Sequence, residues 1–93
     1  MLKTIARRRK YATQWLRKIK RWMRPNGTKE EREVRALSKV AVRALLAGQK
    51  DSLLGAVTWM MILASRSGHH CDMIDAGLDI LGKSNHSLFG GER

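Results

Sequence analysis

The residues with the clearest chemical potential lie near the start of the chain, in the segment ARRRKYATQWLRKIKRWMRP at positions 6–25. Ten of the 19 lysine and arginine residues occur within the first 24 positions, and the first acidic residue is Glu30. Ammonium and guanidinium groups bind phosphate oxygens, and arginine does so through two parallel hydrogen bonds. Tyrosine and tryptophan beside such cations can stack on unpaired bases. The segment therefore predicts binding to a polyanion.

These residues are expected to lie on one amphipathic helix over residues 1–24, because apolar side chains recur there at helical spacing. Pro25 disfavours the α conformation of Arg24, and Asn26-Gly27 is a turn pair, so the helix should end there. The apolar stripe consists of Leu2, Ile5, Ala12, Leu16, Ile19 and Met23. The candidate nucleic-acid-binding residues are Lys3, Arg7, Arg8, Lys10, Gln14, Arg17, Lys18, Arg21 and Arg24, with the aromatic residues Tyr11, Trp15 and Trp22.

The clustered cations repel one another unless an anion is present. Like charges one helical turn apart destabilise a helix, and Arg7 with Lys3 and Arg21 with Arg17 are spaced in this way. The whole chain has a formal charge of +11, and +10 of it is carried by residues 1–24. A field of one sign on one element indicates a property of the partner rather than of the fold. An anionic partner is therefore expected.

The remaining chain predicts a helical core over residues 28–82, with helices at about 28–47, 51–66 and 72–81. Thr28 and Glu31 form a capping box for the second helix, and Gly48 provides its stop. The third helix, capped by Asp51 or Ser52, is apolar on nearly every side. A secondary basic stripe on the second helix consists of Arg32, Arg35, Lys39 and Arg43.

The third helix is expected to be a buried core helix that includes Trp59. Its apolar run covers residues 53–64, whereas about 20 residues are needed to cross a bilayer. Residues 83–93 are expected to form a flexible tail that Leu88 and Phe89 hold against the core. With no strand signal, the sequence predicts an all-α fold, a small bundle of about four helices in one domain.

The fourth helix carries an acidic stripe, Asp72, Asp75 and Asp79, that is either a solvated face or an intramolecular partner for a basic helix. Three carboxylates also exclude this helix as a reader of DNA, since phosphates would repel it.

No catalytic constellation is evident, so we do not expect an enzyme, and no cofactor is expected. His69, His70, Cys71 and Asp72 are potential metal ligands, but zinc sites use separated pairs of ligands, so a polar loop between helices is expected and no metal site. A single cysteine gives no internal disulfide and favours a reducing, cytoplasmic compartment.

The stretch ARRRKYATQW resembles the arginine-rich RNA-binding motifs of phage antitermination proteins of the N type. The likeness covers about ten residues, and those proteins lack an apolar helix like residues 53–64, so it implies no function for the whole chain.

Three partners remain open. Nucleic acid, RNA or DNA, is favoured by the excess of arginine and the adjacent aromatic rings. A small regulator or inhibitor of the phage or plasmid type could instead dock its basic helix on an acidic patch, or in the nucleic-acid channel, of a larger enzyme. Peripheral membrane binding would use the same cations, with tryptophan at the lipid interface.

Overall fold

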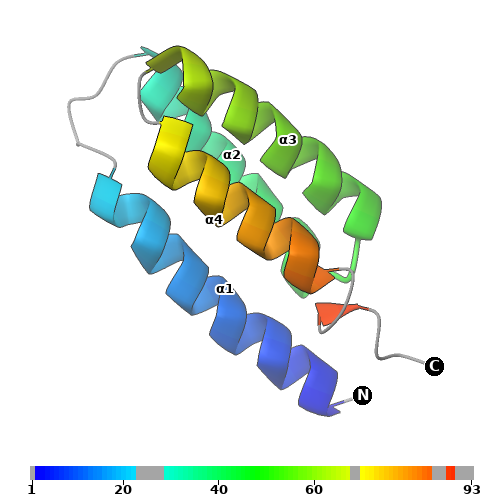
Figure 1. Cartoon of the computed structure of the whole chain (residues 1–93). Coiled ribbons are helices and arrows are strands. Elements are labelled where there is room, and N and C mark those ends of the chain that lie inside the picture. Colours follow the sequence, from blue (N-terminus) through cyan, green and yellow to red (C-terminus); the bar gives the residue numbers. More distant parts are fainter. Residues whose placement is uncertain (1, 23–28, 68–69, 85–87, 90–93) are drawn as a thin grey trace.

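The computed structural model describes residues 2–22, 29–67, 70–84 and 88–89, and within them the chain forms α-helices and no strand. The helices are α1 (Leu2–Trp22), α2 (Lys29–Leu46), α3 (Lys50–Ser67) and α4 (His70–Lys83). Successive helices run in opposite directions and form an elongated bundle, with extents of 41 × 19 × 18 Å (Figure 1). The predicted all-α bundle with a long basic N-terminal helix is confirmed.

The helices are arranged as a ring in which each packs mainly against two neighbours. α1 and α3 each contact α2 on one side and α4 on the other (Figure 1). The core lies along the axis of this ring and contains side chains from every helix. The largest fully buried apolar residues of the helices are Trp15 and Ile19 of α1, Val34 and Leu45 of α2, Leu53 and Val57 of α3, and Met73 and Ile80 of α4. The basic helix is thus an integral part of the core.

The connection between α2 and α3 is a tight glycine turn. The Gln49 amide donates to the Ala44 carbonyl at 2.9 Å, and the Gly48 amide donates to the Leu45 carbonyl at 3.2 Å. This pattern is a Schellman motif, and it requires the positive φ of 73° that Gly48 adopts. The predicted stop at Gly48 is confirmed. α3 begins at Lys50, so the expected caps Asp51 and Ser52 lie in its first turn, while Thr28 of the capping box lies outside the described residues.

α3 is not buried on all sides, and the prediction that Trp59 belongs to the core was wrong. Trp59 is 47% exposed and Ile62 is 39% exposed. The reason is geometric, because a helix with two neighbours in a ring keeps an outward face whatever its composition. Against α4 the packing is close: a Cβ atom at Gly77 would lie 2.5 Å from the sulfur of Met61.

The C-terminal residues that the structure describes return to the bundle. Ser84 is buried, and its hydroxyl donates to the Ile80 carbonyl at 2.6 Å. Leu88 is buried and Phe89 packs against the core, as expected for the residues that hold the tail.

Candidate nucleic-acid interface

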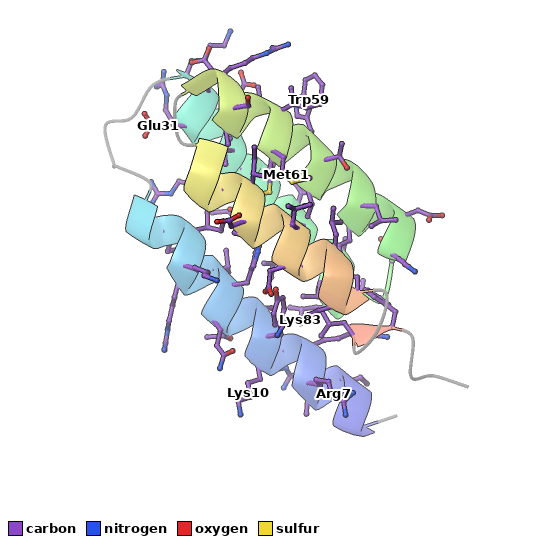
Figure 2. The ribbon with its side chains drawn as sticks, viewed as in Figure 1. Arg7, Lys10, Glu31, Trp59, Met61 and Lys83 are labelled. Atoms are coloured by element: carbon purple, nitrogen blue, oxygen red, sulfur yellow. The ribbon has the colours of Figure 1, made fainter. Side chains whose placement is uncertain are left out.

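One flank of α1 carries four exposed cations and an exposed glutamine, a surface that we call the basic face: Arg7, Lys10, Gln14, Arg17 and Lys18. At about 100° per residue, these positions share one flank of the helix. Lys10 points away from the bundle (Figure 2). No acidic residue occurs in α1, so nothing on this helix neutralises the face. Lys3 and Arg21 belong to the same flank by periodicity, although their side chains are not described.

Arg8 is part of the interior rather than of this surface. It is only 7% exposed, and its Nε donates to the Leu88 carbonyl at 2.8 Å. Its guanidinium lies over the Phe89 ring, 4.6 Å from the centroid, and next to Gly48. The residue that the sequence assigns to phosphate binding therefore links the N-terminal helix to the C-terminal residues. The physical reason is position, because Arg8 lies on the same side of α1 as buried Ala12 and Trp15.

Trp15 is also directed inward. Its side chain is 2% exposed, and its indole Nε1 donates to the Ala76 carbonyl of α4 at 3.0 Å. A ring in this position has no free face on which a base can stack. Trp22 lies within α1, but its side chain is not described, and Arg24 lies outside the described residues.

Tyr11 is half-buried, at the boundary between the core and the exposed basic face. Its hydroxyl donates to the Asp79 carboxylate of α4, and the Lys83 ammonium lies 5.4 Å from its ring centroid. Burial, with the hydrogen bond to Asp79 and the charge of that carboxylate, raises the pKa of Tyr11 well above its ordinary value. The phenol therefore stays a neutral donor. One member of the acidic stripe, Asp79, thus contacts the basic helix, whereas Asp75 is exposed and the Asp72 side chain is not described.

A cleft separates α1 from α4 along the basic face, with a volume of about 450 Å³. Lys83 lies between these two helices (Figure 2). The cleft is lined by Tyr11, Gln14, Trp15, Arg17 and Lys18 of α1 and by Asp79 and Lys83 of α4.

Two residues of α4 that adjoin the basic face, Asp79 and Lys83, were not among the predicted binding residues. Lys83 was assigned to the tail. Asp79 was predicted only as part of an acidic stripe, either solvated or a partner for a basic helix, and its contact with Tyr11 fits the second alternative. Arg9 and Lys20 are exposed too, but they lie on the opposite flank of α1 and do not belong to the basic face.

The secondary basic stripe of α2 lies on the outer surface of the bundle. Arg32, Lys39 and Arg43 are exposed, and Arg35 is half-buried. Because α2 packs against α1 and α3, whereas the cleft lies between α1 and α4, the stripe is a separate surface.

A second hollow, between α3 and α4, is apolar. It is lined by Thr58, Met61, Ile62, Ser65, Ile74 and Leu78. Within the described residues no helix combines the length and hydropathy that crossing a bilayer requires. The same residues contain no group of three or more His, Cys, Asp or Glu side chains suited to a metal ion. The polar loop expected at His69 to Asp72 is wrong for three of its residues, because His70, Cys71 and Asp72 form the first turn of α4. Their side chains, and His69 as a whole, lie outside the described part of the chain.

Comparisons of the chain with protein-family models, with curated proteins and with solved structures found no match.

Proposed function

We propose that this protein is a small, non-enzymatic regulatory protein of the cytoplasm that binds RNA or DNA through the basic face of α1. The observation that supports this most directly is a helix flank of exposed cations with no acid among them. Such a flank contributes self-repulsion to the free protein and releases condensed counterions from a bound phosphate backbone.

The helix is well suited to present these cations as a rigid array. Arg8 and Trp15 tie α1 to the C-terminal residues and to α4 through hydrogen bonds. From Arg7 to Lys18, the basic face rises by about 16 Å, at 1.5 Å per residue. That distance matches about five base steps of a B-form duplex at 3.4 Å each. A preorganised array loses less conformational entropy on binding than mobile side chains on a disordered segment.

Salt dependence tests this proposal. Affinity for a labelled oligonucleotide is measured from low to physiological salt for the wild type and for the double variant Arg7→Gln/Arg17→Gln. The log–log slope of the wild type should be several units, and the double variant should lower its magnitude by about two. The helix content should stay constant, because both side chains are exposed.

Arg66→Gln is a suitable control, since Arg66 is an exposed cation on α3, away from the basic face. Its slope should match that of the wild type. Binding that is independent of salt, or an equal loss in the control, would contradict a phosphate-binding role for the basic face.

A second candidate is a regulator or inhibitor that docks on a larger nucleic-acid-processing protein. The exposed apolar hollow between α3 and α4 favours it, because protein interfaces combine charged rims with apolar centres. This alternative expects weak binding to free oligonucleotide, together with a partner retained after nuclease treatment of a lysate. Contacts bridged by nucleic acid would disappear under that treatment.

Peripheral membrane binding is the least favoured candidate. Interfacial helices insert an apolar face into the lipid boundary. In α1 that face is buried, with Ala12, Trp15 and Ile19 inside the core. Anionic vesicles could attract the cations, but insertion would require α1 to leave the bundle. A blue shift of tryptophan emission with vesicles, without any response to oligonucleotide, would rank membrane binding above nucleic-acid binding.

A further inference from the structure

The cleft between α1 and α4 has the size of a small-ligand site. Its volume of about 450 Å³ falls within the range of about 300–1,000 Å³ typical of such sites. Polar groups from two helices converge on it: Arg17, Lys18 and Gln14 from one wall, Lys83 and Asp79 from the other. The hydrogen bond from Trp15 to Ala76 joins the two helices that form the walls, so the spacing of the walls is set by the fold.

The charges in the cleft indicate an anion that also carries a hydrogen-bond donor. Three cations and one carboxylate leave a net charge of +2 among the lining residues. Phosphate alone would be attracted by the cations but repelled by Asp79. A carboxylate has two oxygens with about four acceptor positions, and the Tyr11 hydroxyl uses one of them. The amino group of a base or a sugar hydroxyl would suit the remaining positions.

We propose that this cleft receives one unpaired nucleotide of a bound single-stranded or looped nucleic acid. Its phosphate contacts Arg17, Lys18 and Lys83, and its base or sugar donates a hydrogen bond to Asp79. Gln14, at the rim, offers both a donor and an acceptor to the base edge. This inference rests on the proposed function and specifies that the bound nucleic acid is unpaired at this site. A paired base could enter the cleft only at the cost of breaking its base pair.

The first test compares two variants that each remove one positive charge. Lys83→Gln removes a cation of the cleft, and Arg66→Gln removes one from α3. Affinity is measured at constant salt for a single-stranded oligonucleotide and for a duplex of the same length. Loss of a charge-assisted contact should weaken binding of Lys83→Gln to the single strand about tenfold. Arg66→Gln should lose less than about twofold, since its charge is screened.

The outcomes separate this inference from the proposed function. If neither single strand nor duplex binds the wild type, the proposed function fails and the inference fails with it. If the wild type binds but both variants lose affinity equally, only the cleft is rejected. A duplex bound more tightly than the single strand would also reject it.

The second test uses the nucleotide itself and does not depend on Lys83. The indole N–H resonance of Trp15, assigned with Trp15→Phe, is followed by NMR during titration with adenosine monophosphate and, separately, with inorganic phosphate. The nucleotide should shift this resonance at lower concentration than phosphate does, because Trp15 lines the cleft. Asp79→Asn should reverse that preference, since it removes the repulsion of phosphate and weakens the acceptor for the nucleotide. Equal responses to both ligands in the wild type would reduce the cleft to a general anion site and overturn the proposal.

Discussion

α1 and α3 differ in how composition relates to burial. α1 is the most cationic helix of the chain, yet it places a guanidinium, an indole N–H and a phenol in buried or half-buried positions, each with a hydrogen-bond partner. α3 is apolar on nearly every side, yet it exposes Trp59 and Ile62. Burial in this bundle therefore follows position in the ring more closely than residue type.

The difference has an energetic basis. A buried polar group is tolerated when its hydrogen bonds are satisfied, so Arg8 and Trp15 can occupy the inner side of α1. An exposed apolar side chain costs little, because more than half of a typical protein surface is apolar. The outer face of α3 is thus compatible with a stable fold, and its apolar character is available for contact with another molecule.

The largest expected effect separates the inner and outer faces of α3. Leu53 is fully buried, so Leu53→Ala should lower the free energy of unfolding by about 2–5 kcal/mol. In a domain this small, that loss is a large part of the total stability. Ile62→Ala, on the outer face, should cost less than about 1 kcal/mol. Chemical denaturation of both variants measures the difference, and equal costs would mean that the outer face is covered in solution.

The next effect distinguishes Arg8 from Arg9, two of the three consecutive arginines of α1. Arg8→Ala removes a hydrogen bond from a charged donor and the contact with Phe89, and should cost about 1.5–3 kcal/mol. Arg9→Ala, at an exposed position, should change stability by less than about 0.5 kcal/mol. Thermal unfolding measures both. Should Arg8→Ala retain full stability while nucleic-acid binding falls sharply, Arg8 would belong to the interface after all.

The helices themselves were predictable from local patterns. Apolar periodicity, the turn at Asn26-Gly27 and the stop at Gly48 led to predicted boundaries for the second to fourth helices within two residues of those observed. The residues on the inner side of α1 were harder to predict from the sequence. Positions 8, 12, 15 and 19 share this side, but apolar residue type predicts burial of Ile5, which is exposed, and exposure of Arg8, which is buried.

The cleft could not be predicted from the sequence. Tyr11 and Asp79 are 68 positions apart, and their hydrogen bond exists only because α1 and α4 pack side by side. No local spacing encodes that pairing. The same argument applies to Lys83, whose ammonium reaches the Tyr11 ring from the last turn of α4.

A smaller effect concerns two glycines, one in α3 and one in α4. Gly55 of α3 has open space around the position of a Cβ atom, so Gly55→Ala should raise the stability by about 0.5–1 kcal/mol through helix propensity. At Gly77 of α4 the Cβ atom would press against Met61, and Gly77→Ala should cost about 1–3 kcal/mol. Denaturation midpoints give both signs. A gain at both sites would show that α3 and α4 pack less closely than their contact at Met61 indicates.

The smallest effect concerns Tyr11, the only tyrosine of the chain, so its ionisation can be followed by tyrosinate absorbance. Burial and the bond to Asp79 raise the pKa of Tyr11 above its ordinary value of 10.0. The folded state therefore holds the proton more tightly than the unfolded state. The resulting stabilisation is fully present below pH 10.0 and is lost as the pH rises above that value. Tyrosinate absorbance should accordingly appear only when alkaline unfolding begins.

Tyr11→Phe should lower the free energy of unfolding by about 0.5–1.5 kcal/mol at neutral pH, because one hydrogen bond is lost. Asp79→Asn keeps an acceptor but removes the charge, so it should let Tyr11 ionise at a lower pH than in the wild type. A normal titration near pH 10.0 in the folded wild type would mean that α1 and α4 do not form this contact, and that the cleft between them is absent in solution.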